Sequence, residues 1–246
     1  MLRKFEELRH SAIQATDGPI GRLPDVYFDD RTWELRYLVV DTGGWLSGRK
    51  VLISPQAIVE YSPDNDFVRL NLTKSQIEGS PDITADEPVS RQGEAALYNY
   101  YGWTAYWPVA PTALAPLPEL TGPAADREEA ITAGYYGGDP NLRSAKEMRG
   151  YYVQATDGDI GHIEDFLIDD ESSRFRYIVI DTRNWLPGKR VVIPTRWITD
   201  VSWAEARITV DVPKEAVRNS PEYNPAIQIT SDYENRLEAS YGRPLH

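Results

Sequence analysis

The chain has 246 residues, with 26 basic and 38 acidic side chains, and its formal net charge is −12. It has no cysteine, which excludes disulfides, thiolate metal sites and cysteine nucleophiles. Acidic residues outnumber basic ones in residues 1–104, 105–141 and 142–246 alike. No region therefore offers the positive surface that nucleic acid requires, and we expect no nucleic-acid binding.

Nothing in the sequence has the pattern of a targeting or membrane segment. Residues 1–9 are charged and lack the apolar run of a signal peptide. The longest apolar stretches, residues 37–40 and 177–180, fall far short of the roughly 20 residues that a spanning helix needs. We expect a cytoplasmic protein with no direct membrane insertion.

A long internal repeat organises the chain. Residues 14–18 (QATDG) return as residues 154–158, and Tyr101-Gly102 returns as Tyr241-Gly242. The offset is 140 positions in both cases, far longer than the roughly 20–50-residue units of solenoid proteins. We interpret it as a duplicated domain. The first unit comprises residues 1–104, a Pro/Ala-rich linker comprises 105–141, and the second unit comprises 142–246.

The elements expected in the first unit have counterparts 140 positions later. A short segment of mixed polarity leads to a Thr-Asp-Gly turn, in which Gly18 supplies the turn geometry. Residues 20–28 then alternate in polarity as a strand with a possible bulge, and Asp29-Asp30 ends that strand. Residues 35–41 are rich in β-branched and aromatic side chains, which predicts a central strand.

Further short strands follow at a regular spacing. Residues 43–48 form a hairpin loop, and residues 51–53, 58–61 and 68–72 have the composition of strands. Turn signals recur about every 8–12 residues, which favours a small sandwich or barrel over a βαβ sheet.

Short helices complete each unit. Residues 73–77 predict a single helical turn that Ser80-Pro81 ends. A longer helix is expected to begin at an N-cap serine, Ser90 or Ser231, and to stop at Gly102 or Gly242. The prolines of the linker favour an extended, fairly stiff connection.

This order of elements resembles the PRC-barrel family, which is named after the cytoplasmic domain of the photosynthetic reaction centre H chain. The matching residues, with their partners 140 positions later, are Thr16-Asp17-Gly18, Ile20-Gly21, Asp29-Asp30, Arg36-Tyr37, Asp41, Trp45-Leu46 and Val51-Leu52-Ile53. The resemblance implies a small antiparallel β-barrel, which each half closes with its own strands. It also implies roles in docking or assembly, with no known catalytic constellation.

The polar residues favour structural roles. Asp29-Asp30 lacks the alternate spacing of acids in a calcium loop, so we expect turn hydrogen bonds there. Asp41 and Asp181 end strands, and we expect each to pair with Arg36 or Arg176 or to cap a loop. The chain has only three histidines, none of them at matching positions of the repeat, so we expect no catalytic residue, metal or cofactor.

Aromatic residues are the candidate partner contacts. Trp45 and Trp185 sit in equivalent loops, where each ring either folds over a barrel end or anchors a partner. A dense cluster follows the first unit's helix, and it either packs that helix and the linker onto the barrel or lines a groove. The cluster comprises Tyr98, Tyr100, Tyr101, Trp103, Tyr106 and Trp107. The second unit has Glu238, Ser240, Tyr241 and Arg243 at the first four of these positions.

The predicted fold is mainly β: two tandem PRC-like antiparallel barrels with short C-terminal helices, related by an approximate two-fold axis. The predicted function is a non-enzymatic module that binds or assembles an unidentified protein partner, with a homodimer as a further possibility. The alternative is an accessory protein of a photosynthetic reaction-centre or electron-transfer complex.

Overall fold

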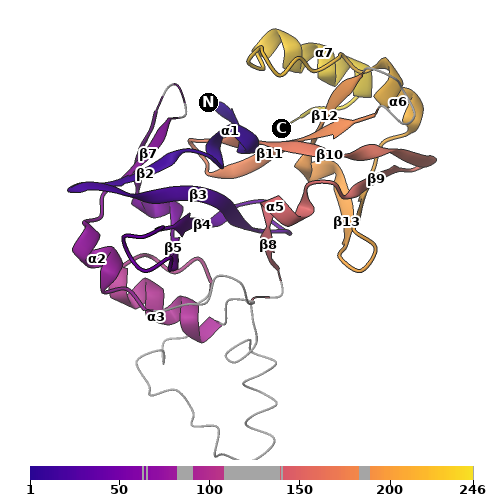
Figure 1. The fold of residues 1–246 in the computed structure, drawn as a ribbon. Coiled ribbons are helices and arrows are strands. Elements are labelled where there is room, and N and C mark those ends of the chain that lie inside the picture. The colour runs from indigo at the N-terminus through magenta and orange to yellow at the C-terminus, as the bar shows by residue number, and fades with distance from the viewer. Residues whose placement is uncertain are drawn as a thin grey trace, which may run out of the picture.

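The computed structural model describes residues 1–62, 64, 66–81, 91–107, 139, 141–182 and 189–245. Within these residues the protein is mainly β, with two seven-stranded sheets and a few short helices. Figure 1 shows the two sheets lying next to each other, each with its own pair of helices at its outer side.

The strands and helices occur in the same order in both halves. The first half contains β1 (Leu2–Lys4), α1 (Phe5–Leu8), β2 (Ala12–Ala15), β3 (Gly18–Asp29), β4 (Leu35–Asp41), β5 (Lys50–Ile53), η1 (Pro55–Ala57), β6 (Ile58–Tyr61), β7 (Phe67–Leu70), α2 (Lys74–Glu78) and α3 (Arg91–Tyr101). The second half contains β8 (Leu142–Ser144), α5 (Ala145–Met148), β9 (Tyr152–Ala155), β10 (Gly158–Asp169), β11 (Arg174–Asp181), β12 (Arg190–Pro194), η2 (Thr195–Trp197), β13 (Ile198–Ser202), β14 (Arg207–Val210), α6 (Lys214–Asn219) and α7 (Ser231–Tyr241).

The sheets are mixed, which corrects the expectation of purely antiparallel barrels. The first sheet runs β5-β4-β3-β2-β7-β6, and its β2·β7 pairing is parallel. The second sheet repeats this order as β12-β11-β10-β9-β14-β13, with β9·β14 parallel. Among the described residues, no hydrogen-bonded pairing closes β5 onto β6. The 3₁₀ turn η1 lies between these two strands in the sequence, and the Ser54 hydroxyl caps it.

The predicted bulge in the long strand β3 is present. The register of β3 against β4 shifts between Arg22 and Asp25 and again between Tyr27 and Phe28. Before the first shift, Gly21 adopts φ +158°, and a Cβ atom built on it would lie 2.0 Å from the carbonyl oxygen of Asp41. Glycine is therefore required here because the β4 backbone passes too close for any side chain.

Each sheet contains one strand from the other half of the chain. β1 pairs with β10 in the second sheet, and β8 pairs with β3 in the first. Figure 1 shows this exchange: the indigo N-terminal strand and α1 lie against β10 and β11, whereas β8 and α5 lie against β3. The finding corrects the expectation that each half builds a sheet from its own strands alone. The exchanged segments are the short stretches of mixed polarity that precede the Thr-Asp-Gly turns.

Two buried aspartates hold the helices of the exchanged segments. Asp165 Oδ1 accepts a hydrogen bond from the backbone N–H of Glu6, 3.1 Å away, at the start of α1. Its counterpart Asp25 accepts from the N–H of Lys146, 3.0 Å away, and from the hydroxyl of Ser144. Each carboxylate thus satisfies a backbone donor that the first helical turn leaves without an intrahelical partner.

A second pair of aspartates fixes the exchanged strands. Asp170 forms an ion pair of 3.0 Å with Arg3 of β1, and Asp30 forms one of 3.1 Å with Arg143 of β8. The matching Asp-Asp turns were predicted to bond nearby backbone N–H groups. Asp29 does so, since its Oδ1 accepts from the N–H groups of Arg31 and Thr32.

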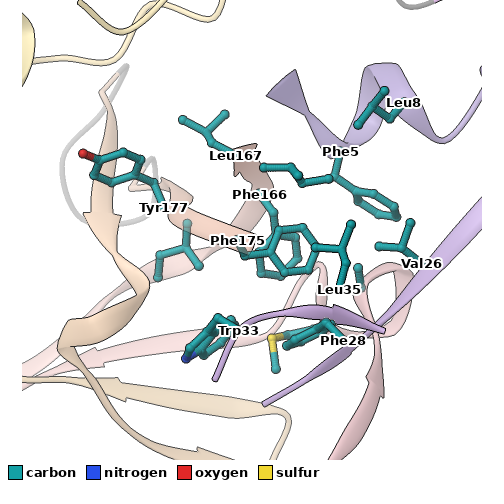
Figure 2. Close-up of a cluster of buried hydrophobic side chains, with 14 of the residues drawn as sticks. Phe5, Leu8, Val26, Phe28, Trp33, Leu35, Phe166, Leu167, Phe175 and Tyr177 are labelled. Atoms are coloured by element: carbon teal, nitrogen blue, oxygen red, sulfur yellow. The ribbon is translucent and has the colours of Figure 1, made fainter. Parts of the chain in front are cut away.

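The two sheets share one hydrophobic core. Phe5 of the exchanged α1 lies edge-on to Phe166 and Phe175 of the second sheet, with ring centroids 6.4 Å apart in both pairs. Phe28 of the first sheet lies 5.0 Å from Phe175. Figure 2 shows these rings converging from both halves of the chain. The apolar cluster is continuous across the junction, so the exchange buries residues that neither sheet would cover alone.

The C-terminal helices end at the glycines that the sequence predicts, and the predicted N-cap Ser90 lies outside the described residues. α3 and α7 are followed by Gly102 and Gly242, which adopt φ +70° and +67°. The N-cap of α7 is Thr230, whose hydroxyl accepts from the N–H of Tyr233. The cap is thus one residue earlier than the predicted Ser231. Threonine and serine are both suited to this role.

Replacing Gly21 tests the close approach of β3 to β4. We expect Gly21→Ala to lower the free energy of unfolding by roughly 2–4 kcal/mol, because the new methyl group overlaps the Asp41 carbonyl. Gly44→Ala is the control, since nothing lies within 4 Å of its Cβ position, and it should change stability by less than about 0.5 kcal/mol. Urea denaturation measures both. Equal effects would contradict the steric requirement.

The buried cap of α1 gives stability a distinct pH dependence. Burial raises the pKa of the Asp165 carboxyl from 3.8 to about 6, so the folded protein holds this proton more tightly than the unfolded chain. Stability should therefore fall as pH rises from about 4 to 6, by up to the order of 3 kcal/mol. Asp165→Asn keeps an acceptor oxygen but cannot ionise, and we expect it to remove this decline.

Denaturant unfolding between pH 4 and 7 measures the effect as the difference between wild type and variant. Asp64→Asn, at an exposed carboxyl, provides the control for the loss of one charge. A profile of Asp165→Asn parallel to that of wild type would contradict the assignment.

Candidate protein-binding site

The aromatic cluster of the first unit covers the outer face of the first sheet. Leu97 and Tyr98 of α3 are buried against Tyr37, Val39 and Leu52, which point outward from β4 and β5. The helix supplies these two residues from the face turned toward the sheet, and Gly102 then ends it. The N–H of Trp103 donates to the carbonyl of Tyr98 at 3.0 Å, which folds the following segment back over the helix end.

Tyr98 is the centre of this packing, and only 4% of its surface is exposed. Its ring contacts Tyr37, Trp103, Tyr106 and Trp107 in edge-to-face geometry, with the Trp107 centroid 4.8 Å away. Such offset contacts each add to the stability gained from burial alone. Most of the predicted contact residues therefore pack on one another, as in the alternative that the cluster joins helix and linker to the sheet.

A buried carboxylate lies beneath the cluster. Glu94 is fully buried, and its Oε1 accepts hydrogen bonds from the hydroxyls of Tyr37 at 2.6 Å and Tyr106 at 2.5 Å. The Tyr106 oxygen also lies 3.0 Å from Asp139 Oδ2. Burial raises the pKa of Tyr37, and the adjacent Glu94 charge raises it further, so the phenol stays a donor at neutral pH.

Arg36 connects this cluster to the turn that ends β3. Its guanidinium lies 3.9 Å from the centroid of the Tyr106 ring and forms ion pairs with Asp29 at 3.1 Å and Glu34 at 2.8 Å. The predicted pairing of Arg36 with Asp41 is therefore wrong. Asp41 instead caps the next loop by accepting from the N–H of Gly43 at 2.8 Å, which was the other expectation for it.

The second unit keeps the tyrosine–glutamate hydrogen bond of this region but pairs its arginine differently. Arg176 forms a 3.0 Å ion pair with Glu234, and the Tyr177 hydroxyl donates to the same carboxylate at 2.7 Å. Arg176 therefore pairs with the helix and not with Asp181, which lies 3.8 Å from the His162 ring. At the end of α7, Arg243 stacks on Trp197 at 4.1 Å. In the first unit, Trp103 at the matching position stacks on Tyr101.

Two of the predicted contact residues reach the surface next to the short helix α2. Trp45 is 38% exposed, and the Nζ of Lys74 lies 5.6 Å from its ring centroid. Tyr100 is 43% exposed, and its hydroxyl donates to the carbonyl of Gln76 at 2.9 Å. We call this surface, made of Trp45, Lys74, Gln76 and Tyr100, the α2 face.

Hydrogen bonds fix the start of the helix that carries the α2 face. Thr73 and Gln76 form a reciprocal capping box at the start of α2. The Lys74 N–H also donates to Asp17 Oδ1 at 2.9 Å, which ties the helix to the repeated Thr-Asp-Gly turn. The sequence predicted both the aromatic side chains of this face and the helical turn at residues 73–77, but not that they lie together.

The remaining predicted residues are placed as follows. Tyr101 and Trp103 are half-buried and stack with centroids 4.2 Å apart. Trp185 and His246 lie outside the described residues.

Within the described part of the chain, no three His, Asp or Glu side chains group where a metal ion would sit. Across the same residues, every helix is too short or too polar to traverse a lipid bilayer.

Comparison with known families agrees with the duplicated architecture. The PRC-barrel domain matches this chain twice, over residues 4–77 and 140–217, which together make up more than half of its length. The chain belongs to the PRC-barrel family. A search of the curated proteins gives no match. Each of the two PRC-barrel matches ends at the same position of the repeat, within α2 or α6.

Replacing Tyr98 and Tyr100 one at a time separates a role in packing from a role at the surface. We expect Tyr98→Ala to lower the free energy of unfolding by roughly 3–5 kcal/mol, since it removes a buried ring at the centre of the cluster. Tyr100→Ala on the same helix should cost less than about 1 kcal/mol, because that side chain is 43% exposed, against 4% for Tyr98. Thermal or urea unfolding of both variants measures the difference. Similar losses at both positions would contradict it.

Proposed function

We propose that this chain is a non-enzymatic protein-binding or assembly module. In it, two PRC-barrels related by an approximate two-fold axis stand in for a homodimer of single barrels. The reciprocal exchange supports this relation, since β1 with β10 and β8 with β3 are equivalent pairings under the repeat. The proposed partner is a protein rather than nucleic acid or membrane, in keeping with the acidic charge of the chain.

The observation that carries this proposal is the exposure of Trp45 and Tyr100 on the α2 face. The other residues of the aromatic cluster are buried or half-buried, whereas Trp45 and Tyr100 are about two-fifths exposed. Tryptophan and tyrosine are enriched among the residues that dominate binding energy at protein interfaces. A capped helix positions both rings, so little ordering is needed when a partner binds.

The proposal also places the contact on one unit only. The matching position of Tyr100 in the second unit is Ser240. A partner that requires both rings therefore binds once per chain. If the chain serves a photosynthetic or electron-transfer complex, the captured partner will be a protein of such a complex, and the same experiment identifies it.

Affinity capture from the native lysate tests the proposed function. The tagged full chain is used as bait, and bound proteins are identified by mass spectrometry. We expect one partner to be enriched, and Trp45→Ala should reduce its recovery at least about tenfold, which corresponds to the loss of one interface hot spot.

Val59→Ala is the matched control, because Val59 is 63% exposed on the same unit but lies on β6. It should leave recovery unchanged. A partner lost equally with both variants would place the contact elsewhere, and no enrichment above background would count against the binding role itself.

A further inference from the structure

The junction between the two units contains a position that faces its own counterpart. An isolated antiparallel bridge pairs Glu34 with Arg174. On either side, the N–H of Leu35 donates to the carbonyl of Ser173 at 2.9 Å, and the N–H of Phe175 donates to that of Trp33 at 2.8 Å. These residues correspond across the repeat, 33 with 173, 34 with 174 and 35 with 175. Equivalent backbones therefore meet antiparallel at position 34.

Such a position restricts which units can pair. Where a surface meets an equivalent surface, the central residue lies opposite its own equivalent. In this chain the two residues carry opposite charges, and the Arg174 guanidinium donates to the Glu34 carboxylate. Two first units joined in this way would place Glu34 against Glu34, and two second units would place Arg174 against Arg174. Only the pairing of unlike units is attractive at this point.

Side-chain size at the neighbouring position, Trp33 in the first unit and Ser173 in the second, also favours the pairing of unlike units. Trp33 and Ser173 both adopt positive φ, +62° and +50°, so the backbone follows the same path in both units. Trp33 is buried and stacks on Phe28 with centroids 5.3 Å apart. A junction of two first units would need room for two such indoles, whereas a junction of two second units would have none. Figure 2 shows the Trp33 ring beside Phe28 in the shared core.

A third contact is also made only once. The indole N–H of Trp203 donates to Asp30 at 3.2 Å, across the junction, and Arg143 stacks on the same ring at 4.4 Å. The residue that matches Trp203 in the first unit is Pro63, which has no side-chain donor. The counterpart arginine, Arg3, instead donates to the carbonyl of Ser62 at 2.9 Å. The two sides of the junction are therefore not interchangeable.

We propose that this junction is a heterotypic recognition surface: the first unit recognises the second unit in preference to another copy of itself. Charge at positions 34 and 174, size at positions 33 and 173 and the Trp203–Asp30 hydrogen bond all act in this direction. The partner that fits the surface is the second unit, from the same chain or from another copy. This inference concerns how the units pair and does not depend on the proposed binding role of the α2 face.

Cutting the folded chain between its units tests the proposal. A protease site is placed within residues 108–138, and the purified full-length protein is cleaved. Cleaved samples with and without ¹⁵N are mixed in urea below the unfolding midpoint, and native mass spectrometry counts the pairs formed. We expect unlike pairs to exceed the statistical proportion, roughly two unlike pairs to one of each like pair, by at least about tenfold. A statistical mixture would overturn the proposal.

Charge reversal identifies the residues responsible. R174E should reduce the excess of unlike pairs severalfold, and E34R/R174E should restore it. R69E is the matched control, since Arg69 forms a 3.3 Å ion pair with Glu60 inside the first unit and undergoes the same change of charge. It should leave the proportions unchanged, and an equal effect of R69E would overturn the assignment.

A measurement on the uncut chain keeps the proposal testable if the cleaved halves do not exchange. R174E should lower the equilibrium constant for folding severalfold more than R69E does. A double-mutant cycle over E34R and R174E separates the pair from the additional bond between Glu34 and Arg36. Favourable coupling between positions 34 and 174 supports the proposal, and the absence of coupling overturns it.

Discussion

The exchange of β1 and β8 between the two sheets is the constraint on which the rest of this structure depends. A strand added to a sheet satisfies its backbone groups only where its partner strand is exposed. Here the partner strand β10 or β3 belongs to the opposite half of the chain. Each half therefore completes the sheet of the other, and the phenylalanines of both halves pack into one core. Neither sheet is complete without the other half of the chain.

The exchange also explains why ionisable groups are buried at the junction. Asp25 and Asp165 lie close to the core, and burial raises the pKa of both carboxyls. An unpaired buried carboxyl is costly, but each of these accepts a hydrogen bond from the first turn of an exchanged helix. These two carboxyls thus help to specify where each exchanged segment ends its strand and begins its helix.

Duplication has left the two units with a common frame and different surfaces. The turns, the long bulged strand and the short helix that an aspartate ties to the Thr-Asp-Gly turn occur in both units, whereas the aromatic cluster around Tyr98 is found in the first. In the second unit Arg176 pairs with Glu234, whereas its counterpart Arg36 pairs with Asp29 and Glu34. A single chain can diverge in this way because its two halves are not forced to be identical, as the subunits of a homodimer are. The α2 face and the junction both contain such differences, at Tyr100 and Ser240 and at Glu34 and Arg174.

The sequence by itself determined the duplication, the family, and most of the strands and helices that follow the Thr-Asp-Gly turns. Periodicity, turn residues and caps are local signals, and both copies carry them. It also identified the aromatic residues, but not which of them are exposed, since burial depends on the sheet onto which α3 folds. Sequence periodicity cannot say which half supplies the neighbour of β3 or β10, because the exchanged segments have the same pattern whichever sheet they join. Only the tertiary structure decided the exchange, the loop-capping role of Asp41 and the meeting of Glu34 with Arg174. The exchange and the Glu34–Arg174 contact join residues that are distant in the sequence. The role of Asp41 depends on the conformation of the loop that follows it.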